Sequence, residues 1–390
     1  MKIFGELQIK AAALAVAMAL CTPVSALAGP GDGLITLETG QTRPAGTATP
    51  SEMTADWGIV RAAEKYSYSD MEQDIWELQR QYGNLMTVNV IGTSCDGRNL
   101  YEIVVGNQSA GKHVMIQGAI HGREYMTPLL VMKQLETALA QYYTGNWDGV
   151  SYSQLFSQAA VHFLPMVNPD GVSISQFGLQ GINSPQLRQT IQEAYDKDLA
   201  EGRTAMSIDR YLTYWKANGR GVDLNSNFDA GWENLNDLGH PSYAGYRGTG
   251  ACSEPESMAL VNLANKHQWS LILNYHSMGE VIYWDYEGNK VQPQSKELAD
   301  LVAGITGYRL IDSSGGGGYK DWVQIKEGPI PSVTVEVGSV SCPMPVSEWS
   351  RVWPQNETVW AAVLSWAVKQ PWPGEGATKA TRKARSPFRT

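Results

Sequence analysis

The chain has little cysteine and no C-x-x-C pair. Only four of its 390 residues are cysteine, which argues against a zinc-thiolate centre. If the first 28 residues are removed as a signal peptide, Cys95, Cys252 and Cys342 remain. This odd number of thiols allows at most one disulfide within the remaining chain.

An excess of positive charge, an internal repeat and an interdomain linker are also missing. The formal net charge of −9 argues against nucleic acid as the partner. No stretch rich in proline, glycine and serine divides residues 66–366, and 390 residues are enough to bury a sizeable core. These features favour one large domain, which we place at residues 59–370.

Long hydrophobic runs are missing except near the amino terminus. There an apolar run, residues 11–21, follows Lys2 and Lys10 and precedes the small residues 25–28 (S-A-L-A). This order is typical of a secretory signal peptide, and the run is too short for a membrane anchor. Leu20 is larger than the small residue that usually precedes a lipidated cysteine. We therefore expect residues 1–28 to be cleaved, and the protein to be secreted to the extracellular space or periplasm without a membrane anchor.

Two polar segments flank the expected domain. Residues 29–58 are rich in threonine, proline and glycine and are expected to be a spacer. Residues 371–390 contain proline, glycine and five basic residues, with only Glu375 opposing them. Such a composition buries too little apolar surface to fold, so we expect a disordered basic tail. Electrostatic contact between this tail and an anionic cell wall is an open alternative.

The first elements expected in the domain are a helix and a hairpin. Ser69 and Glu72 have the spacing of a capping box, which predicts a helix through about Tyr82. Residues 88–91 and 101–105 have the composition of two strands and predict a hairpin.

Strand and helix patterns then alternate along the chain. The strand patterns are at residues 113–120, 161–167 and 270–275, and the helix patterns are near 128–143 and 255–266. This alternation predicts an α/β fold, a three-layer α/β/α sandwich around a mixed, mainly parallel sheet.

His121 and Glu124 lie on the turn between an apolar strand and an apolar-periodic helix. A histidine and a carboxylate at this spacing can bind one metal ion. Zinc accepts both ligand types, and a catalytic zinc needs three protein ligands plus an open position for water. The pair alone is weak, because a core histidine beside a surface acid has the same pattern. A third ligand is therefore expected downstream.

Later segments supply the missing residue types. His276 follows the strand pattern at 270–275, and Glu336 interrupts a β-branched strand at 332–338. A buried glutamate in such a strand is costly unless it is paired or functional. Two further motifs lie between these segments, N-P-D-G at 168–171 and R-G-V-D-L-N-S-N-F at 220–228.

With these residues in this order, the chain resembles the zinc carboxypeptidases of the carboxypeptidase A type over about residues 66–366. The resemblance implies that His121, Glu124 and His276 bind one zinc ion and that Glu336 is the general base. Within that family the chain is similar to the bacterial γ-D-glutamyl-diaminopimelate peptidases, which cut the stem peptide of the cell wall. The segments that carry this narrower likeness are 215–218 (W-K-A-N), 229–233 (D-A-G-W-E), 275–280 (Y-H-S-M-G-E), 282–284 (I-Y-W) and 318–322 (G-Y-K-D-W).

The resemblance also implies a mechanism. Water at the fourth zinc position would have a pKa near about 7, and Glu336 would take its proton and pass it to the leaving amine. The developing oxyanion needs a positive partner. Lys216 falls where most family members have an arginine, and Arg220 is the competing candidate.

Asn225 and Ser226 fall where typical carboxypeptidases have Asn-Arg. In the family that arginine grips the terminal carboxylate of the substrate with two parallel hydrogen bonds, whereas serine can donate one neutral bond. Substrate recognition is therefore expected to rely on Asn225 and Ser226 together with Arg123 or Arg220. The same departure is a property of the diaminopimelate-cleaving branch.

The segment 315–318 (G-G-G-G) precedes Tyr319. It is expected to form a flexible loop over the cleft with Tyr319 as a lid hydroxyl, and a plain glycine-rich turn is the alternative. Because Cys252 and Cys342 each follow a family segment expected near the cleft, they are the candidate disulfide pair. Three free thiols are an equally open alternative.

These features predict a secreted zinc peptidase that hydrolyses the γ-D-glutamyl-diaminopimelate amide bond of peptidoglycan stem peptides, so its partner is a peptide or muropeptide. One rival is a broad-specificity metallocarboxypeptidase that trims the C-termini of peptides, which the missing arginine at Ser226 disfavours. The other rival is a non-catalytic wall-binding relative, which the complete ligand set and Glu336 disfavour.

Overall fold

The computed structural model of the protein describes residues 34–36, 42–44, 58–312 and 315–370. The chain divides into two compact units, Met1–Thr47 and Ala48–Thr390. In the first unit, β1 (Leu34–Thr36) and β2 (Thr42–Pro44) pair antiparallel inside the stretch expected to be a spacer. The expected signal peptide, the rest of the spacer and the basic tail lie outside the described residues.

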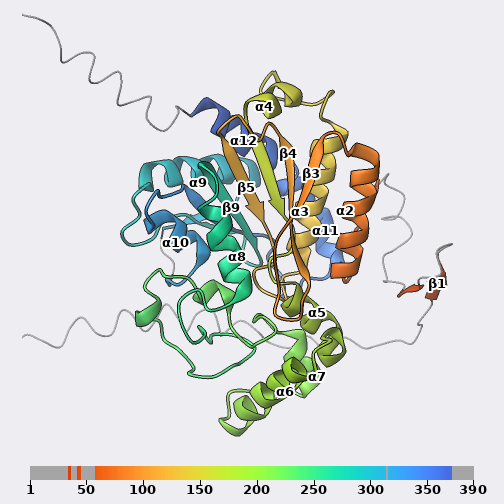
Figure 1. The fold of residues 1–390 in the computed structure, drawn as a ribbon, viewed down its shortest axis with the longest axis vertical. Helices are drawn as coiled ribbons and strands as arrows, with labels where there is room; N and C mark the ends of the chain where they lie inside the picture. Colours follow the sequence, from red (N-terminus) through yellow and green to blue (C-terminus); the bar gives the residue numbers. More distant parts are fainter. Residues whose placement is uncertain (1–33, 37–41, 45–57, 313–314, 371–390) are drawn as a thin grey trace, which may run out of the picture. The chain divides into compact units, whose positions relative to one another are not determined.

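The second unit is built on an eight-stranded sheet with the strand order β11-β10-β12-β9-β5-β8-β4-β3 (Figure 1). Pairing is parallel from β12 through β9 and β5 to β8, and between β10 and β11; the other pairs are antiparallel. This confirms the predicted mixed, mainly parallel sheet. The strands are β3 (Met86–Thr93), β4 (Asn99–Gly106), β5 (His113–Gln117), β8 (Ala160–Leu164), β9 (Trp269–His276), β10 (Val281–Tyr283), β11 (Arg309–Ile311) and β12 (Ser332–Glu336).

Helices lie between some of these strands, whereas β3, β4 and β5 follow one another without a helix, as do β9 and β10. A separate two-stranded ribbon is formed by β6 (Asn146–Trp147) and β7 (Val150–Ser151). The α-helices are α2 (Tyr68–Tyr82), α3 (Met126–Ala140), α4 (Tyr152–Gln158), α5 (Pro169–Phe177), α6 (Pro185–Ala200), α7 (Ile208–Thr213), α8 (Pro255–Ala264), α9 (Gln292–Thr306), α10 (Tyr319–Ile325), α11 (Trp349–Asn356) and α12 (Val359–Lys369). The 3₁₀ helices are η1 (Gly178–Gly181), η2 (Leu224–Ser226), η3 (Trp232–Asn234) and η4 (Val346–Glu348). Among the helices described, none combines the length and apolar character that a membrane span requires.

Helices cover both faces of the sheet, as Figure 1 shows. On one face, helices α2, α3, α9, α11 and α12 contribute to the largest apolar cluster. On the other face, Leu260 of α8 and Val323 of α10 pack with Met115 and Ile272 of the sheet. Because both faces are covered, β5 and β8 are buried at every residue, which explains why most of their residues are apolar. The predicted three-layer α/β/α sandwich is confirmed.

The first helix begins two residues earlier than its expected capping box. Ser67 Oγ accepts a hydrogen bond from the backbone N of Asp70 at 3.1 Å, and the Asp70 carboxylate accepts from the backbone N of Ser67. Glu72 instead accepts hydrogen bonds from the hydroxyls of Tyr68 and Tyr101. The expectation of a Ser69 cap was wrong because Ser67 and Asp70 form the capping box two residues earlier and satisfy the unpaired N–H groups at the start of the helix.

Candidate metal centre and active site

The three candidate metal ligands meet at one edge of the central sheet. His276 is the last residue of β9, and His121 and Glu124 lie in the turn between β5 and α3. Because β5 and β9 are parallel neighbours, their carboxyl ends lie side by side. One donor atom from each residue lies within 4.8 Å of the other two. The structure therefore brings together the ligand set that the sequence predicted.

The donor set fits a zinc ion. Glu124 lies between the two imidazoles, with Oε1 at 2.7 Å from His121 Nδ1 and Oε2 at 3.2 Å from His276 Nδ1. All three side chains are buried, at 6%, 3% and 2% exposed for His121, Glu124 and His276. Burial alone would raise the pKa of Glu124, but His121 and His276 hold it well below its ordinary value. An ionised carboxylate and two imidazoles, all facing one point, are the ligand types that catalytic zinc requires.

Asp223 supports this centre and was missed at the level of sequence. Its Oδ1 lies 3.2 Å from His121 Nε2, the ring nitrogen that faces away from Glu124. Burial would raise the pKa of Asp223, but Lys216 and His121 hold it far below its ordinary value, so the carboxylate is ionised. A carboxylate in this position orients a metal-binding imidazole and raises its basicity. The only sequence signal was its place in the R-G-V-D-L-N run.

Replacing Asp223 with asparagine is expected to weaken zinc binding by about 10–100-fold, because the amide loses the charge that orients His121. A chelator competition titration measures the affinity, and excess zinc should restore most of the activity. The matched control is Asp229→Asn, an exposed acid later in the same loop. Equal zinc affinity in Asp223→Asn and the unmodified protein would contradict the positioning role.

The N-P-D-G motif joins two parts of the site. Asn168 caps α5 by accepting from Gly171 N, and its amide donates to the backbone oxygens of Ile120 and Ala217. A side chain at Gly122 would collide with the Gly171 backbone, so only glycine permits this approach. The motif therefore holds the segment that carries Lys216 against the metal-binding turn.

Glu336, the candidate general base, is the last residue of β12. It pairs in register with His276 on the neighbouring strand β9, which places it beside the metal centre. Burial, with a smaller effect from Glu124, raises the pKa of Glu336 to about 7, against the opposing effects of His276, Lys216 and Arg123. A carboxylate with a pKa near the working pH is suited to accept a proton.

The two candidate cations lie in different surroundings. Lys216 is half-buried, and its Nζ lies 3.9 Å from Asp223 Oδ2. Its charge lowers the pKa of both Asp223 and Glu336, so it faces the candidate active site. Arg220 is exposed and pairs with Glu254 at 3.6 Å. The geometry therefore favours Lys216 as the positive partner of an oxyanion.

Comparison with known proteins agrees with this geometry. The model of the family described as zinc carboxypeptidase matches residues 71–307, a range that includes His121, Glu124 and His276. The chain belongs to the zinc carboxypeptidase family. It is accordingly a zinc metallopeptidase. Glu336 lies beyond the matched range, and its register with His276 brings it to the site.

Two relatives and one solved structure define the likeness further. The chain is 32% identical to "Gamma-D-glutamyl-L-diamino acid endopeptidase 1" of Lysinibacillus sphaericus over 313 residues, 79% of this chain and 74% of the relative. It is 25% identical to carboxypeptidase B of Rattus norvegicus over 245 residues, 62% of this chain and 52% of the relative. The crystal structure of carboxypeptidase A from Helicoverpa armigera shares the fold with a TM-score of 0.58 and 20% identity, covering 80% of this chain and 78% of that chain.

Ser226, the position where this zinc carboxypeptidase departs from the arginine of the typical members, lies in the 3₁₀ helix η2. Gly317 packs against it, because a Cβ at Gly317 would lie 3.2 Å from Ser226 Cα. Gly317 also has a φ of 74°, which favours glycine. Asn225 Oδ1 accepts from the backbone N of Tyr319 at 3.1 Å, so Asn225 holds the start of α10. The glycine segment thus lies directly over the position that usually bears the arginine.

Tyr319 does not occupy the expected lid position. Its side chain is 1% exposed, and its hydroxyl contacts Met115 Sδ and the Leu260 carbonyl in the core between the sheet and α8. The lid expectation is corrected, because Tyr319 is the first residue of α10 and its ring packs with Phe228 on the core side of that helix.

The candidate disulfide between Cys252 and Cys342 is not formed. All three described cysteines are free thiols. Cys342 Sγ lies 3.4 Å from the Arg123 carbonyl oxygen and 3.6 Å from Ser277 Oγ, whereas Cys252 packs with the apolar cluster on the α8 face of the sheet. The alternative of three free thiols describes the structure.

Arg123 lies in the turn between β5 and α3, next to the candidate metal ligand Glu124. Its charge lowers the pKa of Glu336 and of Cys342, so the guanidinium lies close to the metal-binding turn. Its Nε is buried, and no described residue accepts a hydrogen bond from it. The residue as a whole is partly exposed.

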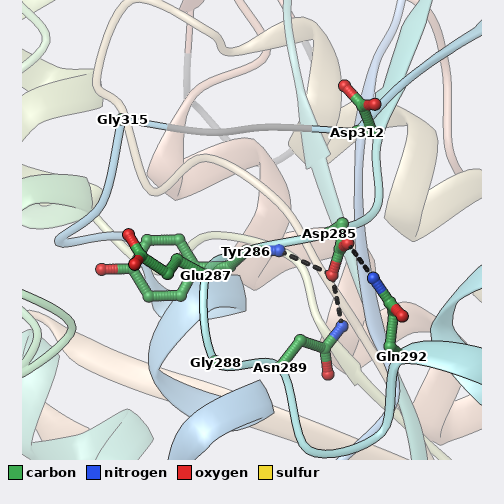
Figure 2. Close-up of a pocket in the computed structure, with 8 residues that line it drawn as sticks. All are labelled: Asp285, Tyr286, Glu287, Gly288, Asn289, Gln292, Asp312 and Gly315. Carbon is green, nitrogen blue, oxygen red and sulfur yellow. Dashed lines mark hydrogen bonds between the residues drawn. The ribbon is translucent and has the colours of Figure 1, made fainter.

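An acidic pocket of about 500 Å³ includes Gly315 of the glycine segment in its lining. Figure 2 shows the Asp285 carboxylate accepting hydrogen bonds from the side chains of Asn289 and Gln292. Glu287 and Asp312 add two further carboxylates to its lining. Tyr286, also in the lining, donates its hydroxyl to Ala230 O, four residues beyond Ser226. The pocket therefore suits a cationic group, and its lining includes none of the metal ligands.

Proposed function

We propose that this zinc metallopeptidase hydrolyses the γ-D-glutamyl-diaminopimelate amide bond of peptidoglycan stem peptides. The observation that carries the proposal is Ser226 beneath the glycine segment, in place of the arginine that binds an ordinary carboxyl terminus. The likeness to a relative named as a γ-D-glutamyl-L-diamino acid endopeptidase, at 32% identity, supports the same substrate class.

The residues around the metal centre suit hydrolysis of an amide. His121, Glu124 and His276 would hold one zinc ion, which supplies a Lewis acid and lowers the pKa of water towards about 7. Glu336 takes a proton from the attacking water and passes it to the leaving amine, which a pKa of about 7 permits in both directions. Lys216 stabilises the negative charge that develops on the carbonyl oxygen.

The charges of Arg123 and of the acidic pocket match a diamino acid. Diaminopimelate carries an amine and a carboxylate in addition to those of an ordinary C-terminal residue. The positive charge of Arg123, a partly exposed residue, attracts a carboxylate, and the acidic pocket at Asp285, Glu287 and Asp312 attracts an amine. Arg220, bound to Glu254, is less available for either role.

The expected location agrees with a cell-wall substrate. We propose export through the signal peptide at residues 1–28, followed by electrostatic retention of the basic tail at an anionic wall. Residues 29–58 would then act as a spacer ahead of the catalytic domain at 59–370, with β1 and β2 as a local ribbon inside it.

The substrate assignment is tested at Ser226. The unmodified enzyme should hydrolyse γ-D-glutamyl-diaminopimelate peptides with a higher kcat/KM than a blocked dipeptide with a free carboxyl terminus. Ser226→Arg should shift this ratio towards the blocked dipeptide by about tenfold or more, because a bidentate arginine–carboxylate pair contributes roughly 1.5–3 kcal/mol. The products are identified by mass spectrometry.

Ser226→Gln is the matched control, because glutamine lengthens the side chain without adding a charge. It therefore distinguishes the effect of crowding against Gly317 from the effect of binding a substrate carboxylate. It should lower activity on both substrates without shifting their ratio. If the unmodified enzyme prefers the blocked dipeptide, the cell-wall assignment is wrong and the protein is a broad-specificity carboxypeptidase.

A further inference from the structure

A second cluster of histidines lies at the other end of the central sheet. His113 is the first residue of β5, and His267 comes two residues before β9, whereas His121 and His276 lie at the carboxyl ends of the same strands. His162 on β8 and Glu102 on β4 complete the cluster on adjacent strands. Three of the six histidines of the chain therefore meet at a place to which the peptidase reaction assigns no role.

The donor atoms of this cluster converge as they do in the catalytic centre. One atom each from Glu102, His162 and His267 lies within 4.8 Å of the other two. The imidazoles of His162 and His267 have centroids 5.1 Å apart. Glu102 and His162 are each 1% exposed, and His267 is half-buried, so solvent reaches the cluster through His267.

The two centres also share an arrangement around one imidazole. In the catalytic centre, His121 Nδ1 lies 2.7 Å from Glu124 and Nε2 lies 3.2 Å from Asp223. In the cluster, His162 Nδ1 lies 2.7 Å from Glu102 and Nε2 lies 2.9 Å from His113 Nδ1. His113 thus corresponds to Asp223: each contacts the Nε2 atom of the histidine whose Nδ1 faces a carboxylate. Residues in such a position orient the imidazole of a metal ligand.

The charges suit a cation. Glu102 Oε1 lies 2.7 Å from His162 Nδ1, and the rings of His113, His162 and His267 have centroids 4.5–5.1 Å apart. A buried carboxylate beside imidazoles is a donor set for borderline divalent metals such as zinc.

We propose that Glu102, His162 and His267 form a second binding site for a zinc-class divalent metal, with His113 as the positioning residue of His162. The site lies at the end of the sheet opposite the peptidase centre. It joins β4 and β8 to the chain that enters β9, so its metal stabilises the fold and takes no part in hydrolysis.

Metal content tests the proposal without any peptide substrate. The full-length protein and its variants are stripped with a chelator, reloaded with zinc chloride, desalted and measured by elemental analysis. The unmodified protein should hold about two zinc ions per chain, and His267→Ala and His276→Ala about one each, because each loses one ligand of a different three-ligand site. His240→Ala, which removes a histidine outside both centres, is the matched control and should keep two.

Thermal unfolding of His276→Ala gives a second measurement. In this variant, added zinc should raise Tm through the remaining site, and the further change His267→Ala should abolish that rise. Because His267 lies outside the strands and is half-exposed, the variant should keep the fold, which circular dichroism checks. One zinc ion in the unmodified protein, or equal zinc in His267→Ala and the unmodified protein, would overturn the second site and leave the peptidase assignment intact.

Discussion

Replacing Glu336 with glutamine is expected to lower kcat by at least about a hundredfold, the lower end of what a positioned general base contributes. Glutamine keeps the shape of the side chain at the end of β12 but cannot accept a proton. Because Glu336 is not among the metal ligands, zinc content and Tm should stay close to those of the unmodified enzyme. The comparison needs steady-state kinetics on the same peptide and elemental analysis of the same sample.

The pH profile supplies an independent check on the same residue. The pKa of Glu336 lies near 7, so its protonated fraction rises as pH falls, and kcat/KM of the unmodified enzyme should decrease on the acid side well above pH 4.5. Glu336→Gln should lack this limb. Glu327→Gln, an exposed carboxylate in the loop before β12, is the matched control and should keep both the rate and the limb. A loss below tenfold in Glu336→Gln would mean that another group is the base.

Replacing His276 with alanine is expected to reduce peptidase activity to background. Of the three predicted ligands the change leaves His121 and Glu124, and two ligands do not hold a catalytic zinc ion. Excess zinc should not restore the activity of His276→Ala, because this variant lacks one ligand. Asp223→Asn differs, because it keeps all three ligands and loses only the residue that orients His121. Activity is measured across a series of zinc concentrations.

His240→Ala is again the matched control, because His240 binds Glu201 and lies outside both metal clusters. It should keep full activity. Restoration of His276→Ala by added zinc would show that the third ligand is another residue, and full activity in the metal-stripped unmodified protein would contradict metal-dependent hydrolysis altogether.

Much of the metal centre could be predicted because its residues stand at the ends of strongly apolar strands. The run before His121 and the run before His276 both mark buried strands, and parallel strands expose their carboxyl ends at one edge. A ligand at such an end is visible in the sequence as a polar residue after an apolar run. Glu336 has the same signature, although it lies beyond the residues that the family model matches.

Other features could not be predicted because they depend on packing between distant segments. Tyr319 follows four glycines and looked like part of a loop, but the start of α10 turns its ring into the core beside Phe228. The pairing of Cys252 with Cys342 failed for a similar reason, because each thiol packs in a different part of the unit. The local composition around a residue does not predict which side of a helix is buried.

The sequence by itself determined the α/β layers, because strand periodicity is a local property of the chain. Its resemblance to the zinc carboxypeptidases implied the three candidate ligands and the candidate base, and the spacing of His121 and Glu124 agreed with that ligand set. Only the tertiary structure decided that Asp223 orients His121, that Lys216 and not Arg220 faces the site, and that Glu102, His162 and His267 meet. The contact of Asp223 with His121 and the cluster of Glu102, His162 and His267 join residues that are far apart along the chain. Only the packing of strands and loops in the folded domain brings their side chains within hydrogen-bonding or metal-binding distance.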